Sequence, residues 1–126
     1  MKKLILNKTK NTPQITFDKK AGNFEISGRS LPEEVTSFFS PVFEWLNEYV
    51  AKPNDKTVFK FKLEYVNSST RRVLHEILTV LERVKAQAKD ITIAWYYLDD
   101  DIEMKEVGID YSEIIDLPFD FISYTN

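Results

Sequence analysis

Residues 57–66 constrain the fold most strongly, because apolar and polar side chains alternate along the whole segment. Alternation with a period of two is typical of a β-strand that buries one face. A sheet covered by helices on both faces would need central strands that are apolar throughout. The segment therefore predicts a sheet with helices on one face only. The open, polar face should carry Glu25, Lys60, Lys62, Glu64 and Tyr96.

The first part of the chain predicts a hairpin. After a polar N-terminal arm at residues 1–12, residues 14–18 and 23–27 both alternate between apolar and polar side chains. The intervening residues 19–22 end in a glycine, the residue that most readily makes such turns.

A helix should follow this hairpin. Ser30 and Glu33 have the spacing of a capping box, and the apolar stripe that begins after them predicts a helix that ends near Ala51. Pro41 lies inside this stripe and lacks an N–H group, so we expect a kink or a break near Ser40.

The rest of the chain alternates between helices and strands. The pattern predicts a helix that is capped within residues 67–70 and runs to about Ala88, a strand at 91–97, a weaker helix up to about Ile115, and an edge strand at 117–124. The order β-β-α-β-α-β-α-β requires parallel neighbours after an antiparallel hairpin. We expect one α+β domain over residues 1–126, built on a mixed sheet.

Composition excludes most familiar catalytic centres. The chain has no cysteine and a single histidine, His75, so disulfides, thiolate metal sites and histidine-rich sites are absent. His75 lies away from the apolar stripe of its helix, which favours an exposed surface residue. We expect no cofactor.

The distribution of charge favours protein partners. The net charge is −3, but the first residues are basic and Lys105 is the only Lys or Arg after residue 89. A nucleic-acid footprint would need positive charge gathered on one face, so we expect no nucleic-acid partner. The longest apolar run, Ile93–Leu98, is far below the roughly 18 residues of a membrane span, and Leu4–Leu6 is too short for a signal peptide. We expect a cytoplasmic protein without membrane insertion.

The first candidate site is Asn67-Ser68-Ser69-Thr70, between a strand and a helix. Backbone N–H groups and the helix dipole favour an anion at such a point, and a phosphate on Ser68 would add it. Arg71 and Arg72 would support that phosphate, since basic residues in a first helical turn otherwise oppose the dipole. The alternative is a simple helix cap, with Arg72 paired to Glu76.

The second candidate is the acidic run Asp99-Asp100-Asp101 with Glu103 and Glu106. These carboxylates could hold a hard cation such as Mg²⁺, although the spacing of a calcium loop is missing. A solvated loop that caps the third helix is the favoured alternative, and an acidic recognition surface is the intermediate one.

Two aromatic residues, Trp45 and Tyr96, fall outside the apolar stripes of their elements. Trp and Tyr often anchor protein interfaces, so both are candidate partner contacts together with Asp99, Asp100 and Asp101. A partly covered flank of the core is an equally good explanation. Trp95, by contrast, belongs to the buried face of its strand.

Several separated motifs together resemble one protein family. They are Thr12-Pro13, Leu31-Pro32-Glu33, the segment Phe39-Ser40-Pro41-Val42-Phe43-Glu44-Trp45-Leu46, Tyr65-Val66-Asn67-Ser68-Ser69, Ala94-Trp95-Tyr96-Tyr97 and Leu117-Pro118-Phe119. In this order, over residues 8–122, they resemble the SiaC family of bacterial biofilm-regulating phosphoproteins. The resemblance implies a fold similar to STAS domains, the anti-sigma-factor antagonists.

The resemblance also implies a phosphorylation switch. In the family, the residue after the turn asparagine is phosphorylated by a dedicated Ser/Thr kinase and dephosphorylated by a PPM-type phosphatase. The unphosphorylated form activates a diguanylate cyclase, which makes c-di-GMP. Carried over by position, Asn67 is the turn residue and Ser68 the acceptor, where the family pattern has threonine; Ser69 and Thr70 are alternative acceptors.

Three functions remain open from the sequence. The first is a non-enzymatic switch that controls a diguanylate cyclase and biofilm formation through Ser68. The second is a STAS-like antagonist that captures an anti-sigma factor in a partner-switching pathway. The third is a metal-dependent hydrolase that uses the acidic cluster from Asp99 to Glu103. The oligomeric state is not encoded in these patterns.

Overall fold

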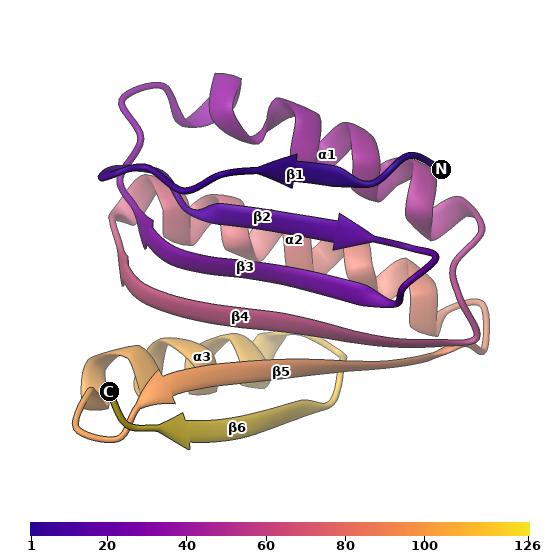
Figure 1. Cartoon of the computed structure of the whole chain (residues 1–126). Coiled ribbons are helices and arrows are strands. Elements are labelled where there is room, and N and C mark those ends of the chain that lie inside the picture. The colour runs from indigo at the N-terminus through magenta and orange to yellow at the C-terminus, as the bar shows by residue number, and fades with distance from the viewer.

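The six strands lie in the sheet in the same order as in the chain, and three helices pack behind them (Figure 1). The computed structural model describes all of residues 1–126. Its elements are β1 (Leu4–Leu6), β2 (Gln14–Asp18), β3 (Asn23–Ser30), α1 (Val35–Ala51), β4 (Lys56–Val66), α2 (Ser68–Lys85), β5 (Asp90–Leu98), α3 (Ile102–Ile114) and β6 (Phe119–Tyr124). β1, β2 and β3 pair antiparallel, whereas β3 to β6 pair parallel. The predicted mixed sheet and the predicted order of elements are confirmed, with one further strand at the start.

That further strand, β1, corrects the prediction of a polar arm over residues 1–12. Leu4, Ile5 and Leu6 pair with Phe17, Thr16 and Ile15 of β2. The side chains of Leu4 and Leu6 pack against the core. A run of three residues is too short to show a periodic pattern, so the alternation of apolar and polar residues does not predict this strand.

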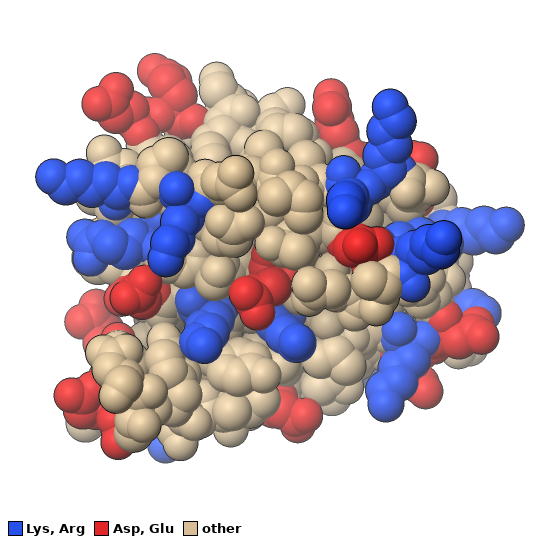
Figure 2. Space-filling model, in the orientation of Figure 1, with Lys and Arg blue, Asp and Glu red and all other residues tan.

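The open face of the sheet has the polar character that the sequence predicts. Glu25, Lys60, Ala94 and Asp120 are register partners across β3, β4, β5 and β6, so one row of the sheet carries both charge signs. Figure 2 shows this face, with basic and acidic side chains interspersed among uncharged ones. All three helices lie on the opposite side of the sheet (Figure 1).

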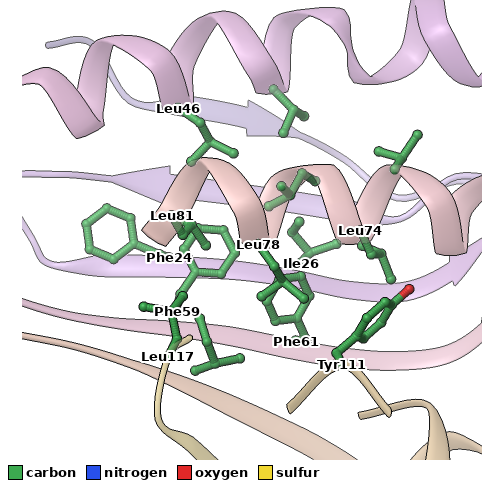
Figure 3. Packing of buried hydrophobic residues seen from close by; sticks show 14 of the residues in the cluster. Phe24, Ile26, Leu46, Phe59, Phe61, Leu74, Leu78, Leu81, Tyr111 and Leu117 are labelled. Carbon is green, nitrogen blue, oxygen red and sulfur yellow. The ribbon is translucent and has the colours of Figure 1, made fainter. Parts of the chain in front are cut away.

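The core lies between the sheet and the helices. The buried face of β4 contributes Phe59 and Phe61, and Leu74 and Leu78 of α2 point toward it (Figure 3). Trp95 of β5 is fully buried, as predicted, and its ring packs 5.4 Å from that of Phe61 between centroids. This continuous apolar layer fixes the ends of the strands, where the candidate site lies.

The structure contradicts the predicted capping box before α1 and the predicted break near Ser40, while the alternative of a kink stays a prediction. Ser30 and Glu33 do not form a capping box, because Ser30 ends β3 with its side chain buried, and the helix begins at Val35 with no side-chain cap. Pro41 does not break the helix, which runs without interruption from Val35 to Ala51. Phe39 and Val42 on either side of the proline are buried, and this packing outweighs the hydrogen bond that proline cannot make.

No helix of the chain combines the length and the apolar character that a membrane span requires.

Candidate functional site

The candidate site lies at the junction between β4 and α2, at the carboxyl edge of the parallel strands. Asn67 has an extended backbone and caps α2: its side-chain Oδ1 accepts from the backbone N–H of Thr70 at 2.9 Å. The cap predicted from the sequence is therefore confirmed. In sheets with parallel strands and crossover helices, this edge is where binding sites form.

Thr70 is a structural residue in this junction. Its side chain is fully buried, and its Oγ1 lies 2.9 Å from the Oγ of Ser30, which is also fully buried. The Thr70 hydroxyl also lies within hydrogen-bonding distance, 3.2 Å, of the Ser30 carbonyl, and the Asn67 N–H donates to the same carbonyl at 3.1 Å. These contacts tie the start of α2 to the end of β3 and leave the Thr70 hydroxyl inaccessible.

The two serines differ in their surroundings. Ser69 is half-buried, and its hydroxyl donates to Asn67 Oδ1 at 3.0 Å. Ser68 is exposed, and its hydroxyl has no hydrogen-bond partner in the protein. Of the three hydroxyls in the junction, only that of Ser68 is both accessible and uncommitted.

Two arginines flank Ser68. A helix turns by 100° per residue, so Arg71 and Arg72 lie on either side of the position of Ser68, one turn further along α2. No acidic residue occupies the first turn of α2. The positive end of the helix dipole and two arginines one helical turn away therefore lie near a single free hydroxyl, and both favour an anion at this surface.

The ion pairing of these arginines differs from the sequence prediction. Arg72 forms no ion pair with Glu76; instead, Arg71 pairs with Glu103 of α3, with 3.2 Å between Nη2 and Oε1. Both side chains lie on the surface, and Glu103 is 84% exposed. The sequence gives no signal for this pair, because its members are 32 positions apart.

Tyr111 joins α3 to the same junction. Its hydroxyl donates to the backbone carbonyl of Arg71 at 2.6 Å. Burial raises the pKa of Tyr111 to about 12, and the nearby Arg71 guanidinium lowers it by a smaller amount. Tyr111 therefore remains a neutral hydrogen-bond donor across the physiological pH range. Sequence patterns place Tyr111 only on a weak helix, and they do not reveal this contact.

Two cavities adjoin the junction. A small cavity of about 80 Å³ lies between the end of β4 and the start of α3, and a larger groove of about 490 Å³ lies between α1 and α2. Arg71 and Glu103 line the small cavity with the exposed Tyr65, while Ser69 and Arg72 line the groove. Ser68 itself lines neither cavity, but its neighbours on α2, Ser69, Arg71 and Arg72, do.

The acidic cluster does not form a metal site. No group of three or more His, Cys, Asp or Glu side chains is arranged to hold a metal ion. Asp101 caps α3 instead, since its Oδ1 accepts from the N–H of Met104 at 3.0 Å, while Asp99 and Asp100 are exposed. The alternative prediction of a solvated loop that caps the third helix is therefore confirmed.

The two candidate aromatic anchors occupy different environments. Trp45 is buried at 7% exposure, its Nε1 donates to the carbonyl of Lys2 at 2.7 Å, and it stacks on Tyr49. It belongs to the core under the start of β1, which agrees with the alternative explanation of a covered flank of the core; a partner contact of Trp45 stays a prediction. Tyr96 is half-buried on the open face of the sheet, with the Nζ of Lys62 5.9 Å from its ring centroid. His75 is exposed, as predicted.

Comparisons with known proteins identify the class of this domain. A family model described as the SiaC family regulatory phosphoprotein matches residues 6–124. An uncharacterized protein of Pseudomonas aeruginosa (strain UCBPP-PA14) is 26% identical over 119 residues, which are 94% of each chain.

Two crystal structures are also similar to the chain. One is apo-SiaC from Pseudomonas aeruginosa, with a TM-score of 0.89 and 25% identity over 97% of this chain and 99% of that one. The other is the diguanylate cyclase SiaD in complex with its activator SiaC, from the same organism, with a TM-score of 0.89 and 25% identity over 96% and 99% of the two chains. The fold and its edge junction thus define a small regulatory domain. The chain belongs to the SiaC family of regulatory phosphoproteins.

Proposed function

We propose that this protein is a non-enzymatic regulatory phosphoprotein, and that phosphorylation of Ser68 switches its binding to a partner protein. The observation that carries the proposal is the state of the Ser68 hydroxyl, which is exposed and uncommitted between two arginines at the start of α2. A phosphate there would carry about −1.5 to −2 charges at neutral pH, next to the positive end of the helix dipole. Ser68 is also the position that the family resemblance assigns as acceptor.

The other hydroxyls of the junction are less suitable acceptors. A kinase would have to unfold the start of α2 to reach Thr70, because its hydroxyl is buried against Ser30. Phosphorylation of Ser69 would remove its hydrogen bond to Asn67, the residue that caps the helix. Modification of Ser68 breaks no existing contact.

We propose a diguanylate cyclase as the partner, and hence a role in c-di-GMP signalling and biofilm formation. The support is the structure of the Pseudomonas aeruginosa activator with its cyclase, in which the activator chain matches this one over almost its whole length. A dedicated Ser/Thr kinase and a PPM-type phosphatase would add and remove the phosphate. Binding would change without a change of fold, because a dianion in a complementary interface repels acidic groups and loses solvation.

The first experiment identifies the phosphorylated residue. The protein is purified from its own bacterium in growing and in surface-attached cells, and its intact mass and phosphopeptides are measured. We expect one phosphate on Ser68, present in a fraction that varies with growth state. A phosphate on Ser69 or Thr70, or a single unmodified mass in every condition, would contradict the proposal.

The second experiment tests the partner. The cyclase of the same genome is assayed for c-di-GMP formation with the wild-type protein and with the Ser68→Ala and Ser68→Glu variants. Ser68→Ala should activate like the unphosphorylated protein, and Ser68→Glu should bind the cyclase more weakly. Thr79→Ala, which changes another exposed hydroxyl of α2, is the matched control and should leave activation unchanged. Equal binding by Ser68→Glu and Thr79→Ala would count against the switch.

A further inference from the structure

Arg71 connects two helices that begin side by side at the carboxyl edge of the sheet. Its Nη2 lies 3.2 Å from Oε1 of Glu103, in the first turn of α3. The pair is held weakly, because the side chains of Arg71 and Glu103 are 44% and 84% exposed. Exposed ion pairs lose most of their attraction to solvent screening and to the entropy of holding two long side chains. Arg71 can therefore be drawn away by a stronger anion.

A phosphate on Ser68 would be such an anion. Residues three apart are neighbours on a helix surface, so Ser68 and Arg71 are within reach of each other. A phosphate carries nearly twice the charge of a carboxylate and offers three oxygens, to which a guanidinium binds in a bidentate manner. It would also sit at the positive end of the α2 dipole, where Glu103 does not.

We infer that phosphorylation of Ser68 transfers Arg71 from Glu103 to the phosphate, which leaves Glu103 without its ion-pair partner. The inference rests on the proposed function, because it requires a phosphate at Ser68. The charge then changes at two places. At the start of α3, the carboxylates from Asp99 to Glu103 lose a nearby cation, and at the start of α2 the phosphate adds negative charge. The surface that a partner meets would become more acidic over both junctions.

The helices themselves would stay in place during this exchange. The bond from the Tyr111 hydroxyl is made to the backbone carbonyl of Arg71 and not to its guanidinium. The Arg71 side chain can therefore rotate while α3 remains attached to the first turn of α2. Lys105, the other cation near the start of α3, lies with its Nζ 5.6 Å from the ring centroid of Tyr97.

The test places the phosphate at residue 68 directly, by incorporating phosphoserine during translation, so that no kinase is needed. The pKa of the phosphate is then followed by ³¹P NMR in the full-length protein. We expect Arg71→Gln to raise this pKa by roughly half a pH unit, because an opposite charge that favours the dianion is lost. An unchanged phosphate pKa in Arg71→Gln would overturn the inference, and an effect of Arg72→Gln alone would assign the contact to Arg72.

A second pair of variants tests the competition with Glu103. Glu103→Gln should lower the phosphate pKa, because Arg71 can then bind the phosphate without first breaking its ion pair with Glu103. Glu106→Gln removes an exposed carboxylate one turn further along α3 that forms no ion pair, and it controls for the general loss of negative charge. Equal effects of the two variants would contradict the transfer of Arg71.

The two hypotheses fail separately. If phosphopeptide mapping in cells places the phosphate elsewhere, the proposed function fails, whatever the NMR titration of the installed phosphoserine shows. If Ser68 is phosphorylated in cells but Arg71→Gln does not affect the phosphate, the proposed function stands and the transfer of Arg71 is refuted.

Discussion

The junctions that open α2 and α3 have the same kind of side-chain cap and opposite charge. Asn67 and Asp101 each accept a hydrogen bond from the N–H three residues on, at 2.9 and 3.0 Å. The first turn of α3 contains Glu103, which suits the helix dipole, whereas the first turn of α2 contains no acid and is followed by two arginines. The start of α3 thus has the negative charge that the helix dipole favours, while the start of α2 has none. A junction of this kind is stable enough to fold and still has electrostatic stabilisation to gain from a phosphate.

The largest loss of stability is expected where α3 packs against the sheet. A Cβ on Gly108 would lie 2.5 Å from ring atoms of Trp95, whose Nε1 donates to the carbonyl of Met104. We expect Gly108→Ala to lower the free energy of unfolding by about 3 kcal/mol, because α3 must move off the sheet. Urea denaturation measures it. Gly22→Ala is the control: its φ is +71° with open space around it, and strain alone should cost about 1 kcal/mol. Equal losses would show that α3 is not packed as described.

The attachment of α2 should be broken next most strongly by Thr70→Val. This isosteric change leaves the buried Ser30 hydroxyl without its side-chain partner, and it should lower the free energy of unfolding by about 2 kcal/mol. Thr79→Val is the control, since Thr79 is exposed on the same helix and its hydroxyl bonds only to the carbonyl of His75. A loss no larger than that of the control would mean that Thr70 is not needed to hold the junction.

Tyr111→Phe should weaken the link between the two junctions. At neutral pH the loss of the bond to the Arg71 carbonyl should cost about 1 kcal/mol. The pKa of Tyr111 is raised from 10.0 to about 12 in the folded protein, so the folded state retains this proton more strongly than the unfolded state does. Its contribution to stability is therefore complete below pH 10 and is lost as the pH rises toward 12. Unfolding experiments from pH 8 to 11 should show a smaller difference between wild type and variant at the alkaline end.

Exchanging the charges of the two caps should change the stability least, and the two substitutions should change it in opposite directions. Asn67→Asp keeps a capping oxygen and adds the negative charge that α2 lacks, so it should stabilise the protein by about 0.5 kcal/mol. Asp101→Asn removes a charge from α3 and should destabilise it by a similar amount. Thermal unfolding at low salt measures both. Shifts of the same sign would show that the two junctions do not differ as their charges indicate.

The sequence was sufficient to predict those elements whose apolar residues recur with a regular period. The alternation in residues 57–66 predicts both the strand and the open face, and the helical stripes predict α1 and α2. Elements shorter than one period, such as Leu4–Leu6, carry no such signal. The capping box at Ser30 failed because the same residue types serve a tertiary contact with Thr70, 40 positions away, and a local pattern cannot distinguish the two uses.

The candidate site could be predicted in its local part only. Asn67, Ser68, Arg71 and Arg72 lie close together in the chain, so local patterns predict the cap and the cluster of hydroxyls. That only the Ser68 hydroxyl is uncommitted is visible in the structure alone. Glu103 and Tyr111 come from α3, and their contacts with Arg71 exist only because β5 and α3 are packed beside β4. For Trp45 the sequence left a partner contact and a covered flank of the core equally open, because the pairing of β1 with β2 carries no local signal.

The agreement between strand order and chain order bears on how this protein forms. Every strand pairs with the one made just before it, so no strand has to wait for a distant segment to emerge from the ribosome. Each parallel pair is closed by a single helical crossover, which keeps the sequence separation of paired strands as small as parallel pairing allows. The sheet can be extended one crossover at a time during synthesis, and the last addition, β5 with α3 and β6, is also the one that brings Glu103 and Tyr111 to the start of α2.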